Sequence, residues 1–468
     1  MTCVLSGGIL ASTSACDVFF GATGEMEMSY IMKTDILIVG SGCSGLYCAL
    51  QLPRDRKVTL ITRSDLETND SFLAQGGMCM LKEESDFQSY FEDTLRAGHQ
   101  ENDRESVEIM IRSSQALVKD LLSYGVRFAR DEQGALAFTR EGAHRQNRIV
   151  YYKDVTGKEI TSHLLEQVKK LSNVTLYENT TMVDIIEREN TCYGAVLRME
   201  DGSLERVEAD YTVLATGGVG GLYKHSTNYR HLKGDGLAVA LRHDIRLKDI
   251  HYVQIHPTTF YSEHPEKRSF LISESVRGEG ALLYDKHMNR FVDELLPRDL
   301  LTIEIRKQME KDGTEFVWED LRTIPEDELR SHFPNIIQHC LDMGYDVFKE
   351  PIPVVPAQHY FMGGIWVDHQ SRTSMNRLYA VGETACNGVH GKNRLASNSL
   401  LESMVFAKRA ADEMAIHPVV EHDSEFVGSV SLAPYEDQKA LEEQYRDLVR
   451  DAIKKSRQEA EQKQADRQ

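Results

Sequence analysis

Three closely spaced glycines follow a short apolar segment near the start of the chain. The segment, residues 34–39, has the composition of a buried strand, and an apolar helical stretch comes directly after the glycines. The turn between them reads Gly40, Ser41, Gly42, Cys43, Ser44 and Gly45. Glycines at this spacing allow a tight turn and a close approach of the backbone to a pyrophosphate, and the helix N-terminus offers N–H groups to the phosphates. The pattern favours a dinucleotide site over its alternative, a glycine turn without a ligand.

The elements that must position this turn are parallel strands. Residues 57–63 read as the second strand, and two further apolar segments, 209–216 and 378–383, each run into a glycine turn. The second strand ends in Thr62 and Arg63, where NAD-binding folds often place an acid for the ribose hydroxyls, so the common NAD pattern is disfavoured. Because the two later segments are far apart, we expect a dinucleotide domain interrupted by an insertion.

These elements predict an α/β fold: a Rossmann-like domain interrupted by an α+β capping domain and followed by a C-terminal helical segment. The three prolines in residues 351–356 exclude a helix there, and residues 435–468 lack glycine and read as a polar helix. The expected parts are a disordered extension at 1–32, the dinucleotide domain at 33–249 and 361–415, the cap at 250–360, and the helical region at 416–468. Met28 and Met32 are candidate translation starts.

The charge of the chain limits its partners. Lys and Arg number 54 and Asp and Glu 73, and the net charge of −19 disfavours nucleic acid and anionic membranes. It also repels an anionic substrate at long range, so an anion site must be built from local cations. No run approaches the roughly 20 apolar residues of a membrane-spanning helix. The eight cysteines form no CxxC pair, so we expect no metal site, no disulfide framework, and a cytoplasmic protein with reduced thiols.

A series of further motifs, spread over residues 33–430, resembles the succinate dehydrogenase/fumarate reductase flavoprotein family. The motifs are SFLAQGG at 71–77, GDG at 234–236, HPT at 256–258, RGEG at 277–280, PRD at 297–299, AQHY at 357–360 and NRLASNSL at 393–400. Chance does not produce so many motifs in the same order. The resemblance implies that the dinucleotide is FAD.

The FAD contacts that the resemblance implies extend beyond the glycine turn. They are Arg63, Asp70, Ser71, Phe72, Ala74, Gln75, Gly76, Gly77, Asp235, Glu383, Ser399 and Leu400. Glu383 should bond a ribose or ribityl hydroxyl, and the helix that begins at Ser399 should direct its positive end at the flavin, where it stabilises the charge of the reduced form. Membrane-bound members carry a histidine joined to flavin at the position of Asp70. We therefore expect noncovalent FAD.

The same resemblance implies a pocket for a C4 dicarboxylate. The implied substrate contacts are Glu141, His256, Ser273, Glu274, Arg298, His359 and Arg394, of which Glu141, His256, Arg298 and His359 are also candidate catalytic residues. Arginine binds carboxylates through two parallel hydrogen bonds, and histidine and serine add directed donors. Alone, each residue has a simpler interpretation, such as a turn histidine for His256 or a surface arginine for Arg394. Membership in an ordered series reverses that preference.

One segment points to an amino group on the substrate. Residues 139–144, TREGAH, resemble the members of the family that oxidise aspartate, although residues 142–148 depart from their typical form. In those members the glutamate, here Glu141, faces the α-amino group, whereas the succinate enzymes carry an uncharged residue there. A carboxylate complements the ammonium charge. The alternative interpretation is a surface Glu–Arg pair in a loop.

The expected reaction is the FAD-dependent oxidation of L-aspartate to iminoaspartate, the first step of NAD synthesis through quinolinate. O2 or fumarate is the expected electron acceptor, and quinolinate synthase the expected consumer of the imine. Arg298 resembles the arginine that moves a proton in fumarate reduction, but aspartate oxidation removes no Cβ proton, so we expect Arg298 to bind and orient the substrate. Two alternatives stay open: a soluble fumarate reductase or succinate dehydrogenase-type flavoprotein, and a noncatalytic FAD-binding subunit.

Overall fold

The computed structural model describes residues 31–263, 268–417 and 422–466. Within them, a seven-stranded sheet forms the core of the larger part of the molecule. Its parallel pairs are formed by β1 (Ile31–Val39), β2 (Val58–Ile61), β5 (Val174–Tyr177), β8 (Leu204–Leu214) and β15 (Leu378–Ala380). An antiparallel hairpin of β6 (Thr181–Arg188) and β7 (Thr191–Arg198) continues the sheet beyond β8. The interrupted α/β architecture is thus confirmed, because β15 joins the sheet from beyond the insertion.

The first strand is longer than the sequence indicated. It begins at Ile31, which is paired with Arg206 of β8, so residues 31 and 32 belong to the sheet and not to an extension. The backbone ladder with β8 extends the strand past its apolar part, a pairing that hydrophobic patterning does not reveal. Residues 1–30 lie outside the described part of the chain.

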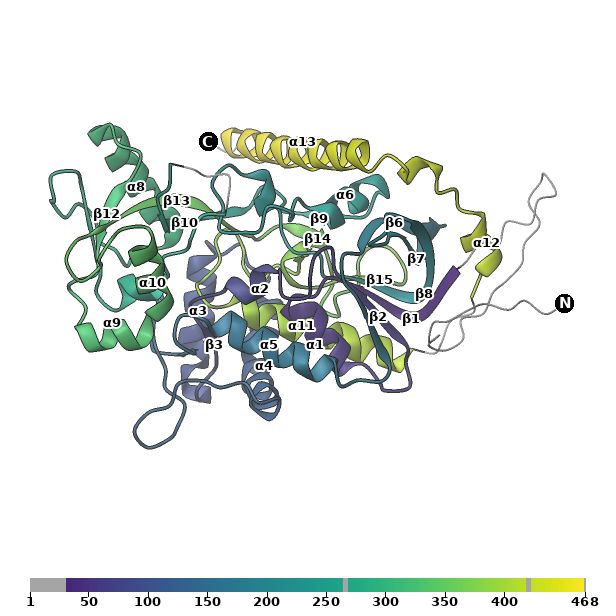
Figure 1. Ribbon diagram of the computed structural model, residues 1–468, viewed down its shortest axis with the longest axis horizontal. Coiled ribbons are helices and arrows are strands. Elements are labelled where there is room, and N and C mark those ends of the chain that lie inside the picture. Colours follow the sequence, from purple (N-terminus) through teal and green to yellow (C-terminus); the bar gives the residue numbers. More distant parts are fainter. Residues whose placement is uncertain (1–30, 264–267, 418–421, 467–468) are drawn as a thin grey trace, which may run out of the picture.

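Helices cover both faces of the sheet. Alternate residues of its central strand point to opposite sides, and because these residues are apolar, both faces must be shielded from water. Ile36 and Ile38 of β1 belong to one apolar cluster, and Leu37 and Val39 belong to another. The first cluster is closed by α1 (Cys43–Gln51), α3 (Phe87–Ala97), α4 (Arg104–Ser123), α5 (Thr156–Val168) and α11 (Ser399–Ile416). The second is closed by α6 (Asp235–Arg242), α12 (Ser424–Ser429) and α13 (Gln438–Ala465), the last lying along the top edge of the molecule in Figure 1.

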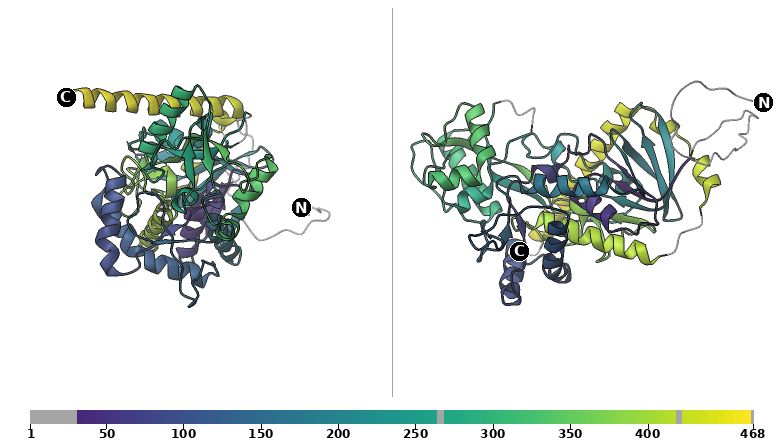
Figure 2. Two further views of the ribbon diagram at one scale, coloured as in Figure 1. Left: turned by 90° about the vertical axis from the view of Figure 1, so that its left-hand side faces the viewer. Right: turned by 60° about the horizontal axis from the view of Figure 1, so that its bottom comes forward.

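The inserted segment has its own antiparallel sheet and its own apolar cluster. The strands are β10 (Val253–Phe260), β13 (Ile352–Phe361), β12 (Val317–Asp320) and β11 (Leu282–Tyr284), in that spatial order. They pack with α7 (Glu274–Gly278), α8 (Arg298–Asp312), α9 (Glu326–His332) and α10 (Pro334–Asp342) around residues between 260 and 354. Figures 1 and 2 show this part at one end of the molecule, away from the large sheet. The separate core supports the expected cap, whose boundaries stay a prediction.

Short elements lie where the two parts meet. They are α2 (Asp70–Leu73), the paired strands β3 (Met78–Cys79) and β4 (Ile149–Val150), and a small sheet of β9 (Leu247–Lys248), β14 (Gly364–Trp366) and β16 (Ala385–Cys386). The proline-rich segment is a strand, as its composition allows: Pro353 lies in β13, and Pro356 falls at a register shift between β13 and β10. The described helices include none that is long and apolar enough to cross a membrane.

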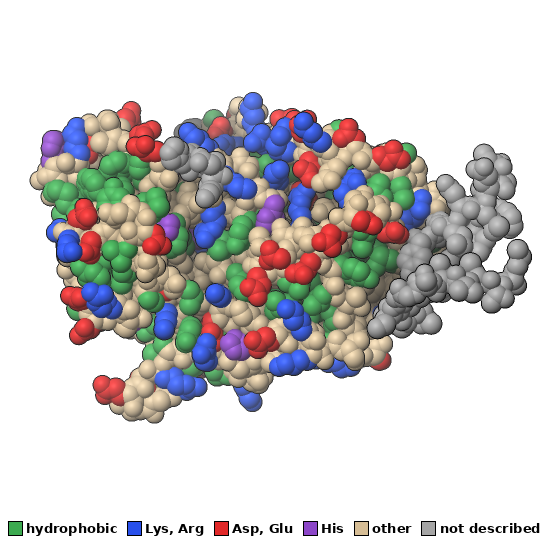
Figure 3. Space-filling view, in the orientation of Figure 1, with side chains coloured by type: hydrophobic (Ala, Val, Ile, Leu, Met, Phe, Trp, Pro, Cys, Tyr) green, Lys and Arg blue, Asp and Glu red, His purple; other side chains and the backbone are tan. Residues whose placement is uncertain are grey.

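The surface carries charges of both signs. Figure 3 shows Lys and Arg side chains interspersed with Asp and Glu over the face that it presents, although the chain as a whole has a net charge of −19. On that face the acidic excess does not form one uniform patch. Cys43, Cys48, Cys79, Cys192, Cys340 and Cys386 are all buried and unpaired, and the other two cysteines lie outside the described residues.

Candidate active site

A continuous cavity runs from the glycine turn of the large sheet to the strands of the cap, and it encloses about 1690 Å³ of empty space, its open mouth included. Most of the predicted cofactor and substrate residues line it together. They are Gly40, Ser41, Gly42, Cys43, Ser44, Arg63, Asp70, Ser71, Ala74, Gln75, Gly76, Gly77, Glu141, Asp235, His256, Ser273, Glu274, Arg298, His359, Glu383, Arg394, Ser399 and Leu400. Residues that the chain separates by hundreds of positions thus share one site.

Two of the predicted cofactor contacts do not line the cavity. Gly45 lies within α1, where a Cβ atom would come within 2.0 Å of the carbonyl oxygen of Gly40, so this glycine allows the helix to pack on the turn. Phe72 lies in α2, and its neighbours Asp70, Ser71 and Leu73 face the cavity instead. A helix turns about 100° per residue, which directs Phe72 away from that face.

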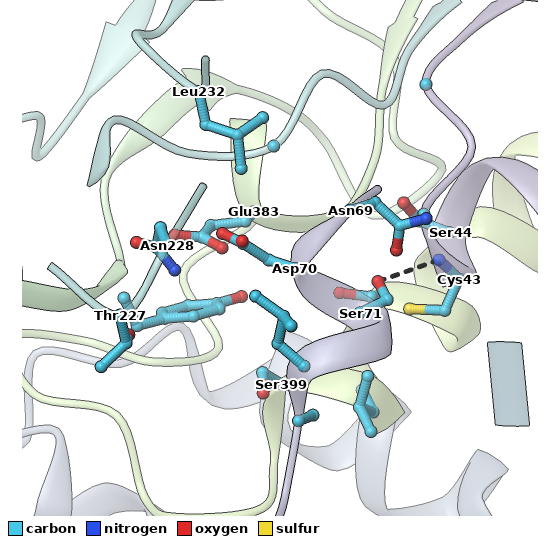
Figure 4. A pocket seen from close by; sticks show the side chains of 18 of the residues that line it. Cys43, Ser44, Asn69, Asp70, Ser71, Thr227, Asn228, Leu232, Glu383 and Ser399 are labelled. Carbon is cyan, nitrogen blue, oxygen red and sulfur yellow. Dashed lines mark hydrogen bonds between the residues drawn. The ribbon is translucent and has the colours of Figure 1, made fainter. Parts of the chain in front are cut away.

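The glycine turn is built as a close approach between two strands and a helix. Gly40 has φ of +125°, and a Cβ atom there would lie 2.1 Å from the carbonyl oxygen of Ala215 in the turn after β8. Ser41 Oγ donates to the carbonyl of Leu66 (3.1 Å). The N–H of Cys43 donates to Ser71 Oγ (3.0 Å), the bond drawn in Figure 4. The helix α1 therefore begins directly beside the cavity, with an extended residue, Gly42, before it. This geometry suits a pyrophosphate.

Two carboxyl groups face this part of the cavity. Asp70 accepts a hydrogen bond from the backbone N–H of Tyr229 (3.0 Å), and Glu383 accepts one from the N–H of Phe361 (2.9 Å). Figure 4 shows both carboxyl groups, with the amide of Asn228, directed at the same space. Burial raises the pKa of Asp70 to about 7, and burial and then the charge of Asp70 raise the pKa of Glu383 to about 8.

Several acceptors in this half of the cavity have no protein donor. Asp70 Oδ2, Gln75 Oε1 and Asn228 Oδ1 are buried oxygens without a hydrogen-bond partner. Buried polar groups are almost always paired, so these three oxygens fit a ligand that carries hydroxyl or N–H donors. The ribityl chain, ribose and isoalloxazine ring of FAD offer such donors, and the glycine turn offers room for its pyrophosphate. The residues present therefore fit the cofactor that the sequence implied.

Arg63 and Asp235 line the cavity near α13. Arg63 forms ion pairs with Asp235 at the start of α6 and with Glu442 of α13 (2.9 Å), and its guanidinium also donates to the carbonyl of His231 (3.4 Å). Asp235 and Arg63 thus orient one another, and the pair fixes the C-terminal helix against this end of the cavity.

The opposite end carries two buried guanidinium groups. Arg394 donates to Ser399 Oγ at the first turn of α11 (2.8 Å), lies 4.3 Å from the ring centre of Tyr360, and has a buried Nε without a partner. Burial and then the charge of Arg298 lower the pKa of Arg394 to about 10. Two like charges held close together without full neutralisation are a site for an anion.

Two neutral histidines stand beside these arginines. The rings of His256 and His359 meet edge to face with centres 5.1 Å apart, and His359 Nδ1 lies 2.8 Å from Thr227 Oγ1. Burial and then Arg298 hold the pKa of both rings well below the usual value. His256 Nε2 is buried without a partner in a residue that lines the cavity. Both histidines can therefore give or take one hydrogen bond without adding charge.

Arg298, the first residue of α8, is held by a network that the motifs only partly indicated. Its Nε donates to Glu274, and its Nη1 donates to Gln254 Oε1 (2.8 Å). Gln254 in turn donates to Asn393 Oδ1 and to the carbonyl of Arg394, both at 2.8 Å. Sequence reasoning did not identify Gln254, because the glutamine lies two residues before the HPT motif and only tertiary packing brings it to both arginines.

Glu274 is the buried counter-ion of this group. Burial favours its neutral form, but Arg298 and then Arg277 outweigh burial, so its pKa lies below the usual value. Arg277 is itself buried and donates to the carbonyl of Glu294 (2.6 Å). The arginine belongs to the RGEG motif at 277–280, so the signal was present in the sequence, although it was not assigned to the site.

Glu141 is the acidic member of the substrate end. Its side chain is 4% exposed, accepts hydrogen bonds from Ser275 Oγ (2.8 Å) and Ser397 Oγ (2.5 Å), and lines the cavity. Burial and then the charge of Glu274 raise its pKa. The alternative of a surface Glu–Arg pair is wrong, since Arg140 is exposed and the partners of Glu141 are serines. Neither serine was identified from the sequence.

The comparisons with known proteins agree with this geometry. The family model described as "FAD binding domain" matches residues 35–400. The L-aspartate oxidase of Clostridium perfringens is 50% identical over 380 residues, covering 81% of this chain and 86% of that protein. The L-aspartate oxidase of Clostridium acetobutylicum is 47% identical, covering 82% and 88%.

Among solved structures, a quinol-fumarate reductase with menaquinol molecules is similar, with a TM-score of 0.81, 28% identity, and coverage of 88% of this chain and 75% of that one. Mycobacterium smegmatis Sdh1 is similar with a TM-score of 0.71, 29% identity, and coverage of 87% and 72%. The architecture expected from the motifs is confirmed by these two similarities.

Proposed function

The chain belongs to the FAD binding domain family and, within it, to the L-aspartate oxidase family, and from this premise we propose that it oxidises L-aspartate to iminoaspartate with FAD as cofactor. The observation that carries the proposal is the position of Glu141. A buried carboxylate lines the same cavity as Arg298 and Arg394, so the cavity offers groups for two carboxylates and for one ammonium. A dicarboxylate without an amino group has no positive charge that could pair with the Glu141 carboxylate.

The residues that would hold FAD lie along the first half of the cavity. Gly40, Gly42 and the start of α1 would receive the pyrophosphate, Asp70 and Glu383 would accept from hydroxyl groups, and the N-terminus of α11 would face the flavin. When bound, FAD supplies a hydride acceptor.

The residues of the other half would bind and orient aspartate. Arg394 and Arg298 receive carboxylates, and the neutral rings of His256 and His359 add hydrogen bonds without adding charge. Glu141 accepts from the ammonium group. Its raised pKa makes it a better proton acceptor, which helps to convert the ammonium into the amine. Loss of a hydride from Cα of the amine gives a protonated imine, and loss of one further proton gives the neutral imine. Arg298, bound to Glu274 and Gln254, orients the substrate.

We propose O2 or fumarate as the acceptor that reoxidises the enzyme, a quinolinate synthase as the enzyme that consumes the imine in NAD synthesis, and the cytoplasm as the place of action. These three points rest on the resemblance of the chain to its family and on the cysteine pattern.

Reduction of fumarate is the second candidate function. The observation that favours it is the direct bond between Arg298 and Glu274, with Arg277 behind Glu274, because a row of guanidinium and carboxylate groups offers a route for a proton to a Cβ atom. Glu141 disfavours it, since a carboxylate repels a substrate that has no positive charge. A noncatalytic subunit is disfavoured by the intact substrate end of the cavity.

The deciding experiment is anaerobic reduction of the FAD-loaded protein. L-Aspartate should bleach the flavin absorption, and succinate at the same concentration should not. Bleaching by succinate alone would instead support the second candidate.

A further inference from the structure

The hairpin that carries Glu141 also carries a histidine that does not reach the cavity. Residues 139–149 are closed by backbone hydrogen bonds, with the N–H of Thr139 donating to the carbonyl of Ile149 (2.9 Å) and the N–H of Ile149 donating back (3.1 Å). His144 lies inside this hairpin, is 6% exposed, and is absent from the residues that line the cavity. Its neighbour Ala143 has φ of +66°, a conformation rare for alanine, so the chain turns sharply to direct His144 inward.

The contacts of His144 fix its tautomer. Nδ1 lies 3.0 Å from Nη1 of Arg148, and because a guanidinium can only donate, Nδ1 must accept. The remaining ring nitrogen, Nε2, then carries the hydrogen and donates to the carbonyl of Ala396 (3.0 Å). Burial and then Arg148 lower the pKa of His144 to about 4, which is consistent with a neutral ring.

Arg148 is held rigidly enough to impose this arrangement. It is fully buried, and it forms ion pairs with Asp86 (3.1 Å) and Asp93 (2.8 Å). Asp93 is itself fully buried and also pairs with Arg145 of the same hairpin. The guanidinium therefore has little freedom to turn away from the histidine.

The carbonyl that accepts from His144, that of Ala396, lies in the loop that carries both Arg394 and Ser397. Ala396 follows Arg394 by two residues and precedes Ser397, whose hydroxyl donates to Glu141 (2.5 Å). Ser397 has φ of +60°, so this loop is held in an unfavourable backbone conformation by its neighbours. On its other side the N–H of Cys79 donates to the carbonyl of Ser397 (2.9 Å).

We propose that His144 is a positioning residue that sets the separation between Glu141 and Arg394, and so makes the site selective for an amino dicarboxylate over a plain one. The hydrogen bond from His144 to Ala396 ties the hairpin of Glu141 to the loop of Arg394. Without it, Glu141 and Ser397 can separate, and the ammonium group loses its partner while the carboxylates keep theirs. The inference rests on the proposed function.

Two substitutions separate the two bonds of His144. His144→Gln keeps an amide N–H at about the position of Nε2, and should still reach Ala396. His144→Asn keeps an acceptor near Arg148 but is too short to reach Ala396. The bond from Cys79 should keep the loop folded in both variants.

The measured quantity is the ratio of the dissociation constants of L-aspartate and succinate. The first comes from saturation of the anaerobic flavin reduction rate, and the second from flavin difference spectra. We expect His144→Asn to raise the ratio roughly 3- to 10-fold, the value of one buried hydrogen bond, and His144→Gln to leave it within about 2-fold. If His144→Asn raises the dissociation constants of L-aspartate and succinate by the same factor, the proposal is overturned, because a general structural defect affects the binding of both ligands equally.

A double-mutant cycle makes the test specific. In a Glu141→Gln background, His144→Asn should no longer change the ratio, because the group that it positions has lost its charge. A change as large as in the parent protein overturns the proposal. If wild-type protein is not reduced by L-aspartate at all, the proposed function fails first, and the inference falls with it.

A second measurement needs no asparagine variant. In protein with 15N-labelled histidines, the signal that His144→Gln removes should be that of a neutral ring protonated at Nε2 from pH 5.5 to 8.5. A ring protonated at Nδ1, or one that titrates in that range, overturns the proposal.

Discussion

Ser397 and Glu141, 256 positions apart in the chain, are joined by a buried hydrogen bond of 2.5 Å from the serine hydroxyl to the carboxylate. The bond links the flavin end of the cavity to the substrate end, because Ser397 also accepts from the N–H of Gly77 in the loop expected to cradle the flavin (3.2 Å). A Cβ atom on the neighbouring Gly76 would come within 2.5 Å of the Glu141 carboxylate, so the loop, the serine and the acid fit together closely.

Neutralising Glu141 should affect aspartate and succinate differently. We expect Glu141→Gln to weaken aspartate binding roughly 10- to 150-fold, the loss of a charge-assisted hydrogen bond of about 1.5–3 kcal/mol. Succinate binding should stay equal or become stronger, since the removed charge repels it. Flavin difference spectra and reduction kinetics give the two constants, with Glu132→Gln on the exposed neighbouring loop as the matched control. If the ratio of the aspartate and succinate dissociation constants is the same in Glu141→Gln and the parent protein, fumarate reduction becomes the favoured function.

Removing the groups that bind the substrate carboxylates should impair turnover without loss of flavin. Arg394→Leu and His359→Ala should each raise the KM for aspartate about 30-fold or more, because losing a charged or hydrogen-bonded partner of a carboxylate costs roughly 2–5 kcal/mol. The visible flavin spectrum reports whether the variants fold. Arg130→Leu, at an exposed position, is the control. Near-normal turnover at low aspartate would remove both residues from the site.

The cofactor should dissociate on denaturation. Asp70 stands where membrane-bound members of the family carry the linking histidine, and a carboxyl group does not form that link. Acid precipitation should therefore leave yellow FAD in the supernatant. Yellow colour retained in the washed pellet would contradict noncovalent binding.

The free energy of unfolding of the cap should fall as the pH rises from the acid range to about 8. Glu319 in β12 is fully buried, both of its oxygens lack partners, and burial raises its pKa to about 8. Between its unfolded pKa near 4.3 and about 8, the folded state binds a proton that the unfolded state has lost. Unfolding free energy therefore decreases with pH through this window, by at most about 1.4 kcal/mol per pH unit from this group.

Glu319→Gln should flatten that dependence, which denaturant titrations at several pH values between 5 and 8 can measure. Glu326→Gln, at an exposed position of α9, is the matched control and should leave the slope unchanged. A slope that is the same in the Glu319→Gln variant and the parent would show that Glu319 is not the group responsible.

The sequence was most informative where structure is local. The strand, turn and helix around Gly40 follow from contiguous residues, and α11 begins at Ser399 as the NRLASNSL motif implied. The exclusion of a helix around Pro353 was equally secure, because proline lacks the N–H that a helix interior needs. Errors appeared where a contact with another segment decided the outcome, as at Ile31, which β8 adds to the sheet.

The residue types of the site can be read from the chain alone: glycines for a pyrophosphate, arginines and histidines for carboxylates, and a glutamate for an ammonium. How those groups are held depends on tertiary packing. The hydroxyl groups of Ser275 and Ser397, the amide of Gln254 and the ring of His144 act through partners more than 40 residues away in the chain. No spacing rule along the chain specifies such pairs, because hydrogen bonds depend on distance and direction in space, and these are fixed by the packing of the cap against the large sheet.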